Sequence, residues 1–160
     1  MKKLFSLFNV CLFAAAALFN SACNSLPEGA TAPKLKIESL ALSRQDNNPV
    51  FIIAYTLQHA SPEPLPIIGI SADVFIKEDK VATLHEEYKN KTLEPNKLER
   101  FELVVPANLM GSAGSDSLVN NTLIMLQGSC ALTVSVTDDT ELNSFNPVSS
   151  YQGLVKVIKE

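Results

Sequence analysis

The sequence predicts an all-β fold, an immunoglobulin- or fibronectin-III-like β-sandwich of about seven strands with one short helix. Two observations support this prediction. Apolar and polar residues alternate with period two in about seven segments, which is the pattern of half-buried strands. Pro, Gly, Asn and Asp residues, which favour turns, separate these segments at regular spacing. The sequence contains neither an internal repeat nor a heptad pattern.

The first two strands are expected at residues 34–42 and 50–58. In the first, Leu35 and Ile37 alternate with polar neighbours, and the Asp-Asn-Asn-Pro run at residues 46–49 supplies a turn. The second, VFIIAYTLQ, is apolar on both faces. We therefore expect it to lie centrally in the sheet.

A hairpin and a further strand follow. Residues 61–66 contain three prolines, which cannot donate hydrogen bonds to a strand ladder, so we expect a loop there. Residues 67–77 and 81–88 alternate on either side of a short polar turn and predict a hairpin. A turn at residues 93–96 leads to the next strand at residues 98–105.

The last third of the chain is less regular. Residues 107–128 are Gly/Ser-rich at first and then place apolar residues at helical spacing, which predicts a loop and a short helix at residues 117–127. Two more strands are expected at residues 130–137 and 148–158, with a polar loop between them.

The N-terminal segment has the parts of an export signal. Lys2 and Lys3 precede an apolar run of about 15 residues, which is short for a membrane span. The small residues Ser21 and Ala22 then precede Cys23. Such a segment resembles a bacterial lipoprotein signal, whose cysteine is acylated, with palmitate among the acyl groups, and becomes the new N-terminus.

This resemblance implies three parts: a signal peptide at residues 1–22, a lipidated flexible tether at 23–33 and a domain at 34–160. The tether is rich in Pro, Gly, Ser and Ala. Asn24, rather than aspartate, follows the cysteine, which implies the periplasmic face of the outer membrane. Asn20 departs from the pattern, which has an aliphatic residue there. An uncleaved anchor helix and an ordinary secretory signal with a free Cys23 thiol are the alternatives.

Size and charge bound the function of the mature chain. Removal of residues 1–22 from the 160-residue chain leaves 138 residues, the size of one domain. The net charge of −4 becomes −6 when Lys2 and Lys3 leave, which argues against nucleic acid as a partner. Cys130 lies among apolar residues and is expected to be a buried, inert thiol. A reactive or intermolecular thiol is the alternative.

The order of elements from residue 34 onward resembles the WHy domain (water stress and hypersensitive response) of type-2 late embryogenesis abundant proteins. The motifs that carry this likeness are LPIIGI at residues 65–70, KEDKVA at 77–82, LEPN at 93–96, FELVVP at 101–106 and SYQGLVKV at 150–157. The resemblance implies an immunoglobulin-like sandwich, no catalysis and a role in envelope or stress protection. QHASP at residues 58–62 departs from the family, which usually has an Asn-Pro-Asn turn there.

No residue is predicted to be catalytic, to bind a cofactor or to hold a metal. His59 and His85 are both expected at solvated polar positions, and neither is part of a zinc-protease motif. The run GSAGS at residues 111–115 is neither a nucleophile elbow nor a phosphate loop. Asp138 and its acidic neighbours could supply oxygen ligands to calcium, but they lack EF-hand spacing, and a solvated loop is preferred.

Three functions follow as hypotheses. The leading one is a membrane-tethered, non-enzymatic lipoprotein that protects the envelope under water or desiccation stress, with weak protein partners. The second is an assembly or adaptor lipoprotein that docks a partner through loops at residues 61–66 and 110–121. The third is an envelope hydrolase or metal enzyme whose pocket would contain His85, Glu87 or Ser112.

Overall fold

The computed structural model describes residues 28–110, 126–136 and 144–158. Within these ranges the chain forms strands and no helix. The strands are β1 (Lys34–Gln45), β2 (Asn48–Gln58), β3 (Leu65–Ile76), β4 (Asp79–Leu93), β5 (Glu99–Pro106), β6 (Leu126–Val136) and β7 (Val148–Val157). The all-β prediction is therefore confirmed for the described residues. The predicted helix at residues 117–127 lies mostly outside them, and its last two residues belong to β6.

The strands form one continuous sheet in the order β4-β3-β6-β7-β1-β2-β5. All neighbours are antiparallel except β1 and β7, which run parallel and pair at Ala41–Lys156 and Leu42–Val157. The expected sandwich has two separate sheets, and here this parallel pairing joins its two halves. The paired stretch is short, and nearer the start of both strands Ile37 N–H donates a hydrogen bond of 3.3 Å to the hydroxyl of Ser149.

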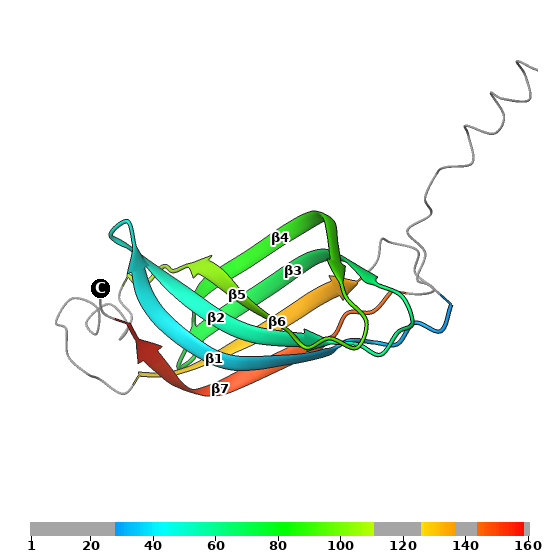
Figure 1. Cartoon of the computed structure of the whole chain (residues 1–160). Coiled ribbons are helices and arrows are strands. Elements are labelled where there is room, and N and C mark those ends of the chain that lie inside the picture. The colour runs from blue at the N-terminus through cyan, green and yellow to red at the C-terminus, as the bar shows by residue number, and fades with distance from the viewer. Residues whose placement is uncertain (1–27, 111–125, 137–143, 159–160) are drawn as a thin grey trace, which may run out of the picture.

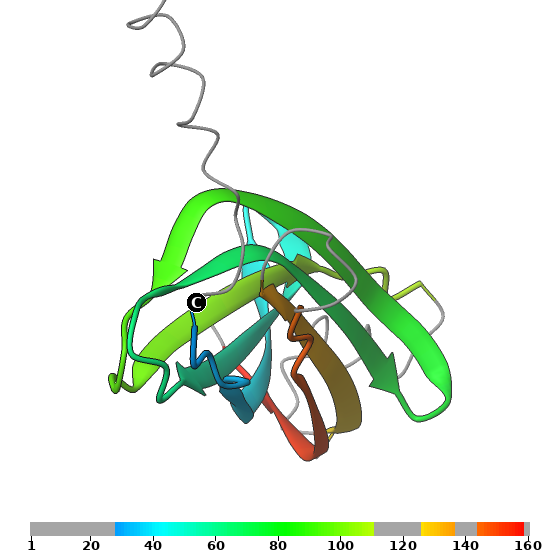
Figure 2. The same cartoon turned by 90° about the vertical axis from the view of Figure 1, so that its right-hand side faces the viewer.

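The sheet curls until its two edge strands, β4 and β5, approach each other, so that it forms a nearly closed barrel (Figure 2). Ala82 of β4 forms an isolated bridge with Ala107, just after β5. Asn108 N–H donates to the carbonyl of Val81 at 2.7 Å. Near the other end of this seam, the ammonium of Lys91 lies 4.7 Å from the ring centre of Phe101.

The strands run between two ends of the barrel (Figure 1). We call one end proximal, because the N-terminal segment meets it; its described parts are residues 28–33, 59–64, 94–98 and 144–147. The opposite, distal end carries the β1–β2 and β3–β4 turns at residues 46–47 and 77–78 and the chain after β5. Figure 1 shows the proximal end on the right and the distal end on the left.

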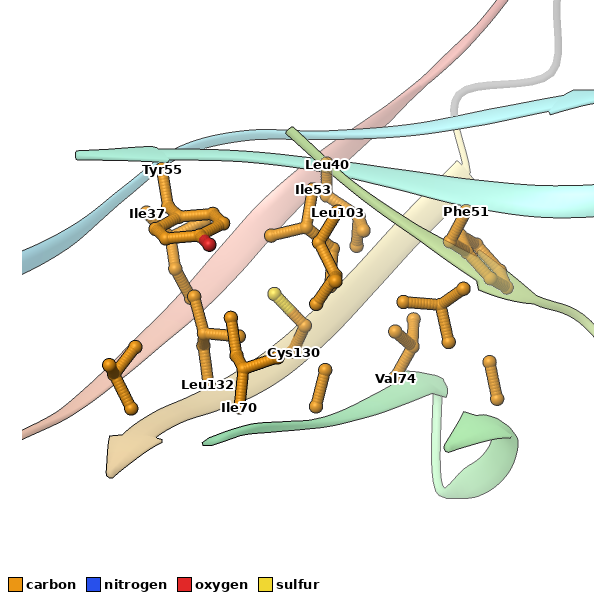
Figure 3. Packing of buried hydrophobic residues seen from close by; sticks show 14 of the residues in the cluster. Ile37, Leu40, Phe51, Ile53, Tyr55, Ile70, Val74, Leu103, Cys130 and Leu132 are labelled. Carbon is orange, nitrogen blue, oxygen red and sulfur yellow. The ribbon is translucent and has the colours of Figure 1, made fainter. Parts of the chain in front are cut away.

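The core lies between the two halves of the curled sheet (Figure 3). Ile53 of β2 and Leu103 of β5 point toward Cys130 of β6 and Ile70 of β3. The strand VFIIAYTLQ pairs with β1 on one side and β5 on the other, but it lies next to the edge strand β5 rather than at the centre of the sheet order as expected. Cys130 is buried, as expected, and burial raises the pKa of its thiol to about 11. Because the thiolate is the reactive form, this environment makes the thiol inert at neutral pH.

Candidate functional site

The proximal end is the part of the described chain where polar side chains are most deeply buried. His59 and Ser61, in the loop after β2, expose 3% and 0% of their surface. Both lie where the loop meets two other segments, the N-terminal residues 28–33 and the β4–β5 turn at 94–98. Buried polar groups need partners, so these two side chains show what the loop holds together.

His59 links the loop to the β4–β5 turn. Its Nε2 lies 2.8 Å from the carbonyl oxygen of Leu93, and its Nδ1 lies 3.2 Å from the amide nitrogen of Ser61. A carbonyl can only accept and an amide N–H can only donate, so the ring is neutral, with its proton on Nε2. The backbone carbonyl of His59 also accepts a hydrogen bond of 2.9 Å from Asn96 N–H.

The expectation that His59 is solvated is therefore wrong. The inward-facing residues of β2 are Phe51, Ile53, Tyr55 and Leu57, at every second position. The same alternation, continued past the end of the strand, brings His59 and then Ser61 inward. This continued phase is the signal that could have identified both residues.

Ser61 links the loop to the N-terminal segment. Its Oγ accepts a hydrogen bond of 2.9 Å from Thr31 N–H and donates one of 3.3 Å to the Thr31 carbonyl. Pro33, two residues after Thr31, is buried, and Ala30 packs against the core. The segment expected to be a flexible tether thus contacts the domain from Ala30 onward. We call the paired hydrogen bonds between Thr31 and Ser61 the clamp.

A second cluster closes the seam between β4 and β5. The Lys91 ammonium lies 4.2 Å from the Tyr88 ring centre and 4.7 Å from that of Phe101, and Phe101 stacks on Tyr55 at 5.3 Å. Burial, opposed by nearby Glu86 and Glu99 charges, lowers the pKa of Lys91. Burial and then the Glu86 carboxylate raise the pKa of Tyr88 to about 12. The lysine therefore joins aromatic rings of two edge strands by cation–π contacts.

A shallow depression of about 630 Å³ lies beside this cluster on β3 and β4. A bulge forms it, because the three residues 88–90 of β4 lie opposite the single residue Ile68 of β3. His85 and Glu87 contribute to its lining. His85 is exposed, as predicted, and its Nδ1 lies 2.8 Å from Ser71 Oγ. No described carboxylate hydrogen-bonds His85, so this pair is a surface contact without the orienting acid of a catalytic triad.

Several residues considered in the sequence lie outside the described ranges. These are Cys23, the GSAGS run at residues 111–115 with Ser112, and the acidic residues around Asp138. Within the described ranges, no three His, Cys, Asp or Glu side chains come close enough to hold a metal ion. The same ranges contain no helix that is long and apolar enough to cross a membrane.

The two loops considered as a docking surface lie at opposite ends of the barrel as far as they are described. Residues 61–66 belong to the proximal end, with Ser61 buried and Pro62, Glu63 and Pro64 exposed. Met110, which is 91% exposed, follows the bridge between Ala107 and the start of β4 at the distal end. The described parts of the two loops therefore do not form one surface.

Comparisons with known proteins show the fold. No protein-family model matches the chain, and no curated protein sequence matches it. The solution structure of AT1g01470 from Arabidopsis thaliana is similar with a TM-score of 0.59 and 13% identity, over 91% of this chain and 97% of that chain. The solution structure of a candidate late embryogenesis abundant (LEA) protein, At2g46140.1, is similar with a TM-score of 0.52 and 12% identity, over 97% of this chain and 86% of that chain. The chain therefore shares the fold of these two structures.

Proposed function

We propose that this protein is a lipid-anchored, non-enzymatic lipoprotein of the bacterial cell envelope that protects envelope components under water or desiccation stress. In this proposal its barrel is an immunoglobulin-like sandwich whose two sheets are joined through β1 and β7. The observation that carries the protective role is the fold shared with a candidate LEA protein over almost the whole chain.

Sequence motifs support the anchor. Lys2 and Lys3, the apolar run and the small residues before Cys23 have the order of a lipoprotein signal. The described domain begins only a few residues after this cysteine. Acylation of Cys23 would therefore hold the barrel beside a membrane, and Asn24 favours the periplasmic face of the outer membrane.

The first experiment tests the anchor. Mass spectrometry of the mature protein from its native host should find the N-terminus at Cys23 with the added mass of acyl chains. The matched variant Cys23→Ser should be found in the soluble envelope fraction or remain unprocessed. An unmodified thiol at Cys23, or a protein that retains residues 1–22, would contradict the proposal.

The second experiment tests the protective role. A deletion strain should survive drying and osmotic stress less well than its parent, and the intact gene should restore survival. Complementation with Cys23→Ser separates the domain's action from its location, because the barrel is unchanged. Survival of the deletion strain equal to that of its parent under both stresses would refute the role.

A further inference from the structure

The clamp determines where the N-terminal segment leaves the barrel. Thr31 is held to the buried Ser61 by two hydrogen bonds, of 2.9 Å and 3.3 Å, and Pro33 is buried just before β1. The chain upstream of Ala30 therefore departs from the proximal end. This arrangement removes the freedom that an unstructured segment up to residue 33 would have.

The length of chain between Cys23 and the clamp is short compared with the barrel. Eight residue steps separate Cys23 from Thr31. Even fully extended they span at most about 29 Å, and as a flexible coil about 16 Å on average. The 12-residue strand β3 is about 40 Å long, or about 30 Å along a barrel axis to which it is tilted. The two ends of the barrel are therefore not equivalent with respect to Cys23.

We propose that the proximal end faces the phospholipid surface of the membrane and that the distal end points away from it. This inference rests on the lipid anchor proposed above and adds an orientation and a contact surface. The contact surface comprises the exposed tips of the loops after β2 and β4, Pro62, Glu63, Pro64, Lys97 and Leu98.

The chemistry of this surface suits zwitterionic head groups. Leu98 is 53% exposed at the tip of the β4–β5 turn, beside the exposed Lys97. An apolar side chain next to a lysine can sit at the boundary between head groups and water. Glu63 and Glu94 are exposed at this end together with Lys34 and Lys97, so its described residues do not form the basic cluster that anionic lipids require.

The test measures the distance of each end from lipid. The full-length protein is produced with its acylated Cys23, in a Cys130→Ala background, and reconstituted into vesicles of zwitterionic phospholipid with a trace of nickel-chelating lipid. One spin label is attached at Lys97→Cys in the proximal end, and in a matched protein at Lys77→Cys in the distal end. The nickel should relax the Lys97 label at least about threefold more strongly, because the distal label lies about 30 Å further along the barrel.

The outcomes separate the two proposals. Equal relaxation at both labels, with the protein still bound to vesicles, would overturn the orientation but not the anchor. A protein that does not sediment with the vesicles would overturn both.

Two variants test the cause of the orientation. Insertion of ten Gly/Ser residues after Ser25 lengthens the chain without touching the barrel, and it should reduce the difference between the labels to less than about twofold. Ser61→Ala should do the same by opening the clamp, with vesicle binding retained. The insertion keeps the test valid if Ser61→Ala does not fold. An unchanged difference after the insertion would overturn the short clamped chain as the cause.

Discussion

The two ends of the barrel are closed by different means. The distal end uses local turns: Asp46 and Asn47 both have positive φ, 50° and 65°, which matches the tight hairpin turn whose twist fits paired strands. The distal end also has backbone hydrogen bonds between distant segments, such as that from Asn108 N–H to the Val81 carbonyl. At the proximal end, by contrast, buried polar side chains make such contacts. Ser61 bonds Thr31, 30 residues away, and His59 bonds Leu93, 34 residues away.

This difference indicates that the proximal end does more than connect strands. A two-residue turn connects the strands of a hairpin at little cost in chain entropy, as at the distal end. The proximal end instead buries an imidazole and a hydroxyl, which is favourable only when every polar atom finds a partner. The result is a fixed exit for the N-terminal segment, which no local turn could provide.

The largest effect on stability is expected from His59→Ala, which removes a buried side chain from the proximal end. The substitution removes a buried ring and leaves Ser61 N–H and the Leu93 carbonyl without their partner. The free energy of unfolding should fall by about 3 kcal/mol, as measured by denaturant unfolding at neutral pH. His85→Ala, at an exposed position, is the matched control and should change it by less than about 0.5 kcal/mol. Equal effects of the two substitutions would contradict the difference between a structural and a surface histidine.

A change at Cys130, in the middle of the barrel, should lower the stability of both ends alike. Burial raises the pKa of Cys130 from 9.0 to about 11. Because the unfolded chain releases this proton first, the free energy of unfolding should fall as the pH rises above about 9, by up to about 2.7 kcal/mol once the pH exceeds about 11. Cys130→Ala should be less stable at neutral pH and should lose less stability between about pH 8.5 and 10. The same alkaline slope in parent and variant would show that the thiol does not cause it.

Ser61→Ala should affect the proximal end more than the barrel as a whole. The loss of the hydroxyl leaves Thr31 N–H without its acceptor and should lower the free energy of unfolding by about 1.5 kcal/mol. Hydrogen exchange should become much faster at Thr31 than at residues of the distal end. Ser71→Ala, which removes a hydroxyl from the outer face of β3, is the control. Protection of Thr31 that survives in Ser61→Ala would argue against the clamp.

The smallest effect is expected at the distal end. Asn47 has a φ of 65°, a conformation that β-branched residues adopt poorly. Asn47→Val should lower the free energy of unfolding by about 1 kcal/mol, whereas Asn47→Gly should leave it unchanged or raise it slightly. Thermal unfolding of the two variants provides the measurement. A loss in Asn47→Val as large as in His59→Ala would remove the contrast between the two ends.

The sequence predicted the strands well because most of them alternate without interruption. The strands β2 and β3 lie within two residues of their expected bounds. The clearest failure is β4, which was expected to end at Tyr88 and continues to Leu93. Residues 88–90 form the bulge, so the period of two is broken there and the strand cannot be followed from sequence.

The proximal end was harder to predict than the fold. The prolines of residues 61–66 predict a loop, but a loop prediction says nothing about which side chains turn inward. Burial of His59 depends on Leu93, 34 residues away, and burial of Ser61 depends on Thr31, 30 residues away. Such partners are fixed by the curl of the sheet, which local patterns do not encode.

The parallel joint between β1 and β7 has a consequence for the timing of folding. β7 is the last of the described strands along the sequence, yet it lies in the middle of the sheet order, between β6 and β1. Until its residues are available, no strand joins β6 to β1, and the groups β1-β2-β5 and β4-β3-β6 can meet only at the seam between β4 and β5. The barrel can therefore be completed only after β7 has emerged from the ribosome or from any pore through which the chain is threaded.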